Sequence, residues 1–266
     1  MAERDRWEAT AARYHVLAPR LTVYRETNRR LVEWAGLAPG LRVVDLACGT
    51  GLTSAAIWAA EPRLAALYAV DFSPAMLRSA RRRLADLPVR WVEADAADFA
   101  RHLAEPVDRI VTNSAFWLFP PAAVAEGYRA LVPGGSWVCN IPDQDFDFGD
   151  GNGSALRELV NRAVRRLPAL GAAAVHDAPP QWSLQVVRER AEGCGFRVER
   201  HGVQAIRLTP QDILDFYRLP KFCRGRLPTG MPYRLGARLL RQALREAVPA
   251  QGVEWRWALF RLVRPR

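Results

Sequence analysis

The sequence lacks any long uninterrupted hydrophobic run, although half of its 266 residues are hydrophobic. A membrane-spanning helix needs about 18 or more consecutive apolar residues. The first ten residues, MAERDRWEAT, are charged where a signal peptide requires an apolar centre. These absences argue against a membrane partner or export and predict a soluble protein of the cytoplasm. The length and the hydrophobic content predict one domain, residues 1–266.

Cysteine and lysine are both scarce. The four cysteines are widely separated and form no C-x-x-C pair, which argues against a zinc knuckle or a disulfide framework and predicts reduced, mostly buried thiols. Lys221 is the only lysine, so arginine carries nearly all of the positive charge behind the net charge of +10. Arg81, Arg82 and Arg83 are consecutive, but they fall mainly on the solvated side of a predicted helix. A nucleic-acid-binding surface needs basic groups clustered across several elements, so nucleic acid is disfavoured as a partner.

Charge is unevenly distributed in the second half of the chain. Residues 201–266 are rich in arginine, whereas the charged residues of DQDFDFGD, residues 143–150, are all acidic. We expect the arginines of residues 218–245 partly to neutralise this acidic segment and partly to favour a substrate that carries carboxylate or phosphate. A calcium-binding loop needs glycine at its sixth position and glutamate at its twelfth, where Phe148 and Ser154 stand. No metal site is predicted.

Strand-like and helix-like segments alternate along the first part of the chain, which is typical of an α/β sheet with crossover helices. Short apolar runs of the kind that is buried on both faces predict five parallel strands. A helix is predicted at 73–88, where Ser73 is a suitable N-cap and Pro74 occupies the first helical position. The predicted strands are 41–47, 64–71, 89–95, 108–114 and 136–142, with another helix at 121–135.

The regular alternation stops after residue 142. Two segments rich in helix breakers, 143–153 and 171–181, are predicted to be loops on either side of a helix at 154–170. The remaining predicted elements are helices from residue 183, at 209–219 and at 233–248, and strands from about residue 196 and at 253–265.

One turn combines an acidic residue with glycines at the end of the first predicted strand. In VVDLACGTG, residues 43–51, the apolar run breaks at Asp45 and the turn contains Gly49 and Gly51. Such a turn lets a cofactor approach bare backbone amides near a helix N-terminus. A nicotinamide or flavin site needs G-x-G-x-x-G, and Ser54 occupies the position of the third glycine. The match to those cofactors is therefore only partial.

Three further motifs follow, each at the carboxyl end of a successive predicted strand. They are VDFSPAML (70–77), EADAADF (93–99) and IVTNSAFWLFP (110–120). With VVDLACGTG, this ordered set resembles the class I S-adenosylmethionine-dependent methyltransferases, in particular their small-molecule branch that is similar to the enzymes of ubiquinone and menaquinone biosynthesis. The resemblance spans roughly residues 10 to 142 and is weaker in the last two predicted strands.

The resemblance implies both a fold and a cofactor. The fold is an α/β, Rossmann-like, doubly wound and mostly parallel seven-stranded sheet with an antiparallel last strand. Helical lid or substrate segments are implied at 1–35, 143–182 and 207–250. The cofactor is S-adenosylmethionine, with S-adenosylhomocysteine as the product, and the implied contacts are Asp45, Ala47, Gly49, Gly51, Asp71, Phe72, Met76, Asp95, Ala96, Asn113 and Ser114.

Each motif has an implied role at the cofactor. Gly49 and Gly51 leave room for the amino-acid tail, and Asp45 is expected near the cationic end of that tail. Asp71 can accept hydrogen bonds from both ribose hydroxyls, and Phe72 can lie against the adenine face.

The later motifs are expected to complete the cofactor site. Asp95 and Ala96 are expected to read the adenine edge, and Asn113 and Ser114 to lie beneath the methionine moiety. The family pattern is D-x-G-x-G-x-G, and Ala47 stands at its first glycine. Because of this departure, one alternative is that the methionine tail of the cofactor lies in a different position from the one it has in the family.

The acceptor is predicted to be a small molecule, in specialised metabolism. The fourth motif lacks the [DN]-P-P-[YF] sequence with which enzymes grip planar amino nitrogens, so DNA-base methylation is disfavoured. Phe116 and Trp117 are the expected substrate contacts. The candidate bases are His176, His15 and Tyr14, although in-line displacement of an activated methyl group mainly requires alignment.

Two alternatives to a small-molecule methyltransferase stay open at this point. One is an enzyme of the same fold that binds S-adenosylmethionine but catalyses cyclisation or rearrangement without methyl transfer. The other is an RNA-binding methyltransferase, which depends only on the basic C-terminal segment. The sequence does not specify an oligomeric state.

Overall fold

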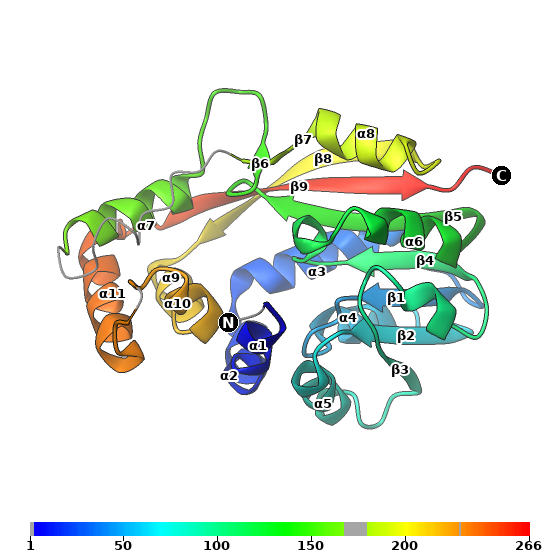
Figure 1. Ribbon diagram of the computed structural model, residues 1–266, viewed down its shortest axis with the longest axis horizontal. Helices are drawn as coiled ribbons and strands as arrows, with labels where there is room; N and C mark the ends of the chain where they lie inside the picture. Colours follow the sequence, from blue (N-terminus) through cyan, green and yellow to red (C-terminus); the bar gives the residue numbers. More distant parts are fainter. Residues whose placement is uncertain (1–2, 168–179, 229) are drawn as a thin grey trace.

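The computed structural model describes residues 3–167, 180–228 and 230–266 (Figure 1). Its main sheet has seven strands in the order β3-β2-β1-β4-β5-β9-β8, and among them only β9 runs antiparallel to its neighbours. The predicted mostly parallel sheet with an antiparallel last strand is therefore confirmed. The strands are β1 (Arg42–Leu46), β2 (Ala66–Asp71), β3 (Val89–Glu93), β4 (Val107–Thr112), β5 (Leu131–Pro142), β8 (Arg197–Leu208) and β9 (Val253–Val263).

Helices cover both faces of this sheet, because its central strands are apolar on both sides. In β1, Val43 packs in the cluster that includes residues of α3 and α4, whereas Val44 packs in the cluster that includes residues of α6 and α8. The crossovers after β1 and β4 thus lie on opposite faces. The carboxyl ends of these two strands frame a crevice where ligands bind in doubly wound sheets. The helices are α3 (Thr22–Ala35), α4 (Leu52–Ala60), α5 (Pro74–Arg83), α6 (Ala122–Ala130) and α8 (Leu184–Glu192).

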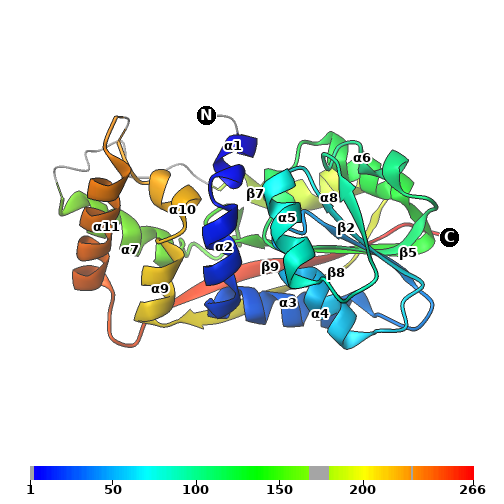
Figure 2. The same cartoon turned by 90° about the horizontal axis from the view of Figure 1, so that it is seen from below.

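The other helices gather beyond one end of the sheet (Figures 1 and 2). The first two helices lie beside α5, and α7 packs against α11 at the far side. These elements are α1 (Glu3–Glu8), α2 (Ala11–Leu17), α7 (Ala155–Arg165), α9 (Pro210–Phe216), α10 (Pro220–Arg224) and α11 (Tyr233–Ala247). Of the short 3-10 helices, η1 (Ala18–Arg20) follows α2, whereas η2 (Phe99–His102) contacts α6 and η3 (Phe116–Leu118) contacts β5. In the described ranges, no helix has the length and apolar character needed to cross a bilayer.

The helix predicted at 121–135 is too long. In the structure α6 ends at Ala130, and β5 begins at Leu131, before the Pro-Gly-Gly sequence. Leu131 pairs with Val107 of β4, and a shift of register before Arg109 accommodates the additional residues. Pairing with the neighbouring strand therefore overrides the local helix and turn signals.

The acidic segment 143–150 was predicted to be a loop neutralised by arginines of residues 218–245. It contains the short strand β6 (Phe146–Asp147), which pairs in parallel with β7 (Trp182–Ser183). Its salt bridges come from Arg256 of β9, which reaches Asp150 and Asp143. Among the described residues, no salt bridge joins the arginines of 218–245 to this segment, because β9 runs directly beside β5 and places Arg256 within reach.

Candidate functional site

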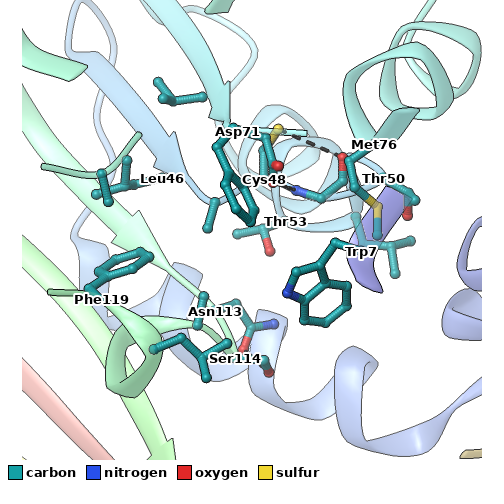
Figure 3. A pocket seen from close by; sticks show the side chains of 18 of the residues that line it. Trp7, Leu46, Cys48, Thr50, Thr53, Asp71, Met76, Asn113, Ser114 and Phe119 are labelled. Atoms are coloured by element: carbon teal, nitrogen blue, oxygen red, sulfur yellow. Dashed lines mark hydrogen bonds between the residues drawn. The ribbon is translucent and has the colours of Figure 1, made fainter. Parts of the chain in front are cut away.

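A cavity of about 260 Å³ opens at the carboxyl ends of β1, β2 and β4 (Figure 3). It is bounded by the turn after β1, by the ends of β2 and β4, and by side chains of α1, α2 and α3. Nine of the eleven implied cofactor contacts line it: Ala47, Gly49, Asp71, Phe72, Met76, Asp95, Ala96, Asn113 and Ser114. The described lining residues that the motifs do not include are Trp7, Tyr14, Tyr24, Asn28, Leu52 and Thr53.

The turn after β1 has a left-handed backbone at Ala47, Gly49 and Gly51, with φ of 61°, 54° and 82°. This conformation is unfavourable for alanine, and it explains why the family pattern has glycine at the position of Ala47. A Cβ added at Gly49 would meet no atom within 4 Å, whereas one at Gly51 would lie 3.0 Å from Leu84. Gly49 therefore keeps the cavity wall open, while Gly51 permits close packing against α5 and is not among the described lining residues.

Asp71 ends β2 with its carboxylate fixed by two backbone amides. Gly49 donates to Oδ2 at 2.8 Å, and Ser73 donates to Oδ1 at 2.9 Å. The residue is 5% exposed. Burial raises the pKa of Asp71 to about 6, and the hydrogen bonds from Ser73 and Gly49 offset part of this increase. Each carboxylate oxygen retains a further lone pair with which it can accept a hydrogen bond from a ligand.

Asp45 lies beneath the turn and not in the described lining of the cavity. It is 1% exposed, and Ser54 of α4 donates to its Oδ2 at 2.5 Å. Burial raises the pKa of Asp45 to about 7, with a partly compensating hydrogen bond from Ser54. The expected contact of Asp45 with the cationic tail of the cofactor stays a prediction, and the structure places its side chain behind the cavity wall. This carboxyl group instead joins β1 to α4 in the interior.

A chain of side-chain amides supports the end of β4. Asn140 of β5 accepts from the Ser114 backbone amide at 2.7 Å and donates to Oδ1 of Asn113 at 2.8 Å. Asn113 in turn donates to Oδ1 of Asn28 at 2.8 Å, and Thr53 donates to the same oxygen at 2.7 Å. Asn28 and Thr53 belong to no motif of the family, so only the packing of α3 beside α4 brings them to the site.

Aromatic side chains from the N-terminal helices form another wall. Trp7, Tyr14 and Tyr24 all line the cavity, and Figure 3 shows the Trp7 indole across the site from Phe119. The rings of Tyr14 and Tyr24 are 5.4 Å apart. Burial raises the pKa of Tyr14 well above its usual value, and the neighbouring Tyr24 adds to the increase. Tyr14 therefore keeps its proton at neutral pH and is suited to donate a hydrogen bond rather than to act as a base.

His15 contacts an arginine instead of the cavity. Arg83 of α5 donates through Nη2 to the His15 carbonyl at 2.7 Å and through Nε to the Thr50 carbonyl at 2.8 Å. Burial and the charge of Arg83 lower the pKa of His15. His15 is not among the described lining residues. His176, the third candidate base, lies outside the described residues.

The fourth motif presents different aromatic residues from the expected pair. Phe116 is 2% exposed and packs in the core against Trp137, with ring centroids 5.3 Å apart. Trp117 packs against Trp257 at 5.9 Å. Neither is among the described lining residues, whereas Phe119 is. Because η3 turns the chain within three residues, the sequence pattern could not decide which ring faces the cavity.

The adenine-side residues lie where the motif order places them, along the neighbouring strand ends. Phe72 follows β2, while Asp95 and Ala96 follow β3, and all three line the cavity with Met76 of α5. Asp95 is exposed, and its Oδ1 accepts from the backbone amide of Ala97 at 2.9 Å. In the described part of the chain, no three His, Cys, Asp or Glu residues are grouped to hold a metal ion.

Residues 43–135 match the family of methyltransferase domains. A trans-aconitate 2-methyltransferase of Acidovorax sp. is 34% identical over 126 residues, which are 47% of this chain and 46% of the relative. A ubiquinone/menaquinone biosynthesis C-methyltransferase of Desulfotalea psychrophila is 34% identical over 142 residues, which are 50% of this chain and 55% of the relative. This chain thus spans about half the length of these curated relatives.

The fold extends beyond the matched segment. A chain from a complex between the Haloferax volcanii Trm112 methyltransferase activator and a methyltransferase superposes with a TM-score of 0.60 and 20% identity, covering 100% of this chain and 98% of that chain. The likeness includes the last two strands, where the sequence motifs are weak. The matched domain and its relatives support a class I S-adenosylmethionine-dependent methyltransferase, and the structural likeness shows that the same fold extends over the whole chain.

Proposed function

We propose that the protein transfers the methyl group of S-adenosylmethionine to a small-molecule acceptor. The observation that carries the proposal is the cavity at the ends of β1 and β2, where Gly49 presents open backbone and Asp71 presents a buried carboxylate. Both curated relatives described above are named for methylation of a small molecule. The site was predicted from the same motifs.

The residues present fit S-adenosylmethionine. Asp71 retains one lone pair on each oxygen for the two ribose hydroxyls. Phe72 supplies a ring for the adenine face, and Asp95 and Ala96 supply polar groups for its edge. A Cβ at Gly49 would project into open space, so its absence leaves the backbone accessible. The bound cofactor would supply a methyl group that its sulfonium activates toward nucleophiles.

The protein would act mainly by alignment, since in-line displacement requires the nucleophile, methyl carbon and sulfur to be collinear. Tyr14 and Tyr24 provide phenol groups that can orient an acceptor oxygen or nitrogen. Trp7 and Phe119 provide apolar walls that exclude water. No side chain of the described lining is required to be a strong base, which suits an acceptor that is already ionised or activated.

The proposed acceptor is a small anionic molecule in the cytoplasm. One relative is named for trans-aconitate, and the chain has a formal net charge of +10, which would attract carboxylates or phosphates. RNA is the competing anionic partner. Binding of random-sequence RNA that weakens steeply with added salt would contradict the proposal, because such dependence reports neutralised phosphates.

The function is tested with S-adenosylmethionine labelled at the methyl group. We would incubate the protein with a panel of small carboxylates and phosphorylated metabolites, and follow the label and S-adenosylhomocysteine together. Equal amounts of labelled product and S-adenosylhomocysteine would support methyl transfer. Conversion of an acceptor without label, with the cofactor recovered intact, would instead establish the cyclase or rearrangement alternative.

A further inference from the structure

The amide of Asn28 has a definite orientation, although oxygen and nitrogen of an asparagine amide look alike. The orientation follows from one backbone group. The Ser114 backbone amide can only donate, so the atom of Asn140 that it contacts at 2.7 Å must be Oδ1. The other end of Asn140 is then Nδ2, which donates to Asn113, and Nδ2 of Asn113 donates to Asn28. The atom of Asn28 in this chain is therefore Oδ1.

This orientation makes the amino group of Asn28 the last group in the series of hydrogen bonds that begins at Asn140. Oδ1 of Asn28 accepts from both Asn113 and Thr53, whereas its Nδ2 makes no hydrogen bond with any residue that the structure describes. Asn28 is 6% exposed and lines the cavity. This amino group is not among the fully buried polar atoms that lack a partner, so it is accessible to a ligand. The cavity that Asn28 lines is the space in which a ligand can provide the acceptor.

The surroundings favour a carboxylate as this partner. Asn28 lies beside Thr53. Thr53 is in the first turn of α4, and the N-terminal end of this helix carries a partial positive charge. The turn that precedes α4 contains Gly49, whose backbone is open to the cavity. A neutral amide donor and a nearby helix N-terminus can together bind a carboxylate oxygen, so no positively charged side chain is needed.

We infer that Nδ2 of Asn28 donates a hydrogen bond to the carboxylate of the amino-acid tail of S-adenosylmethionine. The inference rests on the proposed function, since it takes S-adenosylmethionine as the ligand. Asn28 is then a specificity residue that distinguishes ligands with the amino-acid tail from those without it. A carboxylate of the acceptor has the same chemistry and is the competing partner.

The test compares two ligands by calorimetry at about pH 8. S-adenosylhomocysteine carries the tail, and 5′-methylthioadenosine has the same nucleoside without it. Asn28→Asp keeps Oδ1 for Asn113 and Thr53 and replaces the donor with an acceptor oxygen. We expect S-adenosylhomocysteine to bind at least about ten-fold more weakly to this variant, because a charge-assisted hydrogen bond is lost and like charges meet. The affinity for 5′-methylthioadenosine should change by less than about two-fold.

Two further variants separate recognition from structure. Asn28→Ala removes the donor without adding charge, and we expect a smaller loss that is again confined to S-adenosylhomocysteine. Thr53→Val removes one donor to Oδ1 and leaves Nδ2 in place, so we expect it to affect both ligands alike. Melting temperatures of the free proteins show whether each variant is folded.

Each other outcome has a definite meaning. Equal weakening of both ligands by Asn28→Asp and Asn28→Ala would assign Asn28 a structural role and overturn the inference. Unchanged binding of S-adenosylhomocysteine to a folded variant, with weaker binding of trans-aconitate, would assign the amide to the acceptor and also overturn it. If the unaltered protein binds neither nucleoside, the proposed function itself fails.

Discussion

The backbone amide of Gly49 donates a hydrogen bond of 2.8 Å to Oδ2 of Asp71. This bond joins the turn after β1 to the end of β2, two motifs that are 22 residues apart. It holds the turn in its left-handed conformation and orients the carboxylate toward the cavity at the same time. The carboxylate that we propose as the ribose acceptor is thus held in place by the protein itself, so that ligand binding need not order it.

The first prediction concerns Asp71. Asp71→Ala removes both carboxylate oxygens, and we expect S-adenosylhomocysteine to bind about ten-fold or more weakly because charge-assisted hydrogen bonds contribute about 1.5–3 kcal/mol. Calorimetry measures the affinity, and the melting temperature reports any loosening of the turn. Asp98→Ala is the control, because Asp98 pairs with Arg101 at the surface. Unchanged affinity in a folded Asp71→Ala protein would refute the ribose assignment.

The second prediction is that stability falls as pH rises from about 4 to 7. Burial raises the pKa of Asp45 from 3.8 to about 7 and that of Asp71 to about 6. Between the usual and raised values the native state binds more protons than the unfolded state, so the free energy of unfolding decreases as pH increases. The maximum slope is about 1.4 kcal/mol per pH unit for one proton.

Urea unfolding of the free protein across this pH window measures the effect. Asp45→Asn removes one of the two groups, and we expect a shallower dependence on pH. If the free energy of unfolding of this variant depends on pH as steeply as that of the unaltered protein, Asp45 does not titrate in this window. The outcome is independent of ligand binding.

The third prediction concerns Arg83, which links α5 to both the Thr50 carbonyl and the His15 carbonyl. Arg83→Met should free α2, with faster hydrogen exchange at residues 11–17 and a loss of about 1–3 kcal/mol of stability, since two partly buried carbonyl acceptors lose a charged donor. Arg82→Met is a matched control, because its side chain contacts only Ser79 among the hydrogen bonds described. Equal exchange in the two variants would contradict this role for Arg83.

The fourth prediction concerns the strained turn. Ala47 has φ of 61°, so Ala47→Gly should relieve strain, while the added chain entropy of glycine opposes the gain. We expect a net change within about 1 kcal/mol. Ala47→Val should lose more than about 1 kcal/mol, because a β-branched residue strongly disfavours this conformation. Urea unfolding measures both, and equal stability of the two variants would argue against strain at this position.

The predicted cofactor contacts that line one cavity could be found from the sequence because their positions are local. Asp71, Asp95 and Asn113 each follow a strand by a few residues at most, and parallel strands bring their carboxyl ends to one edge. The order of the motifs therefore placed these residues in one cavity before any contact was known. Asp45 lies outside the described lining of this cavity, and the sequence could not show this because the direction of a side chain at a strand end depends on the turn that follows.

The remaining wall was decided by tertiary structure. Trp7 and Asn28 come from helices that precede the first strand, and no spacing in the sequence connects them with β4 or α5. The same reason applies to Arg256, which neutralises the acidic segment from more than a hundred residues away.

Sequence by itself determined the alternation of strands and helices, the order of the motifs and the resemblance to the methyltransferases, because each depends on short-range periodicity and on turns of a few residues. Only the tertiary structure decided which ring of the fourth motif faces the cavity, where β5 begins, and which way the amide of Asn28 points. Those features depend on long-range packing and hydrogen bonding, in which a single contact between distant segments selects one of several locally acceptable arrangements.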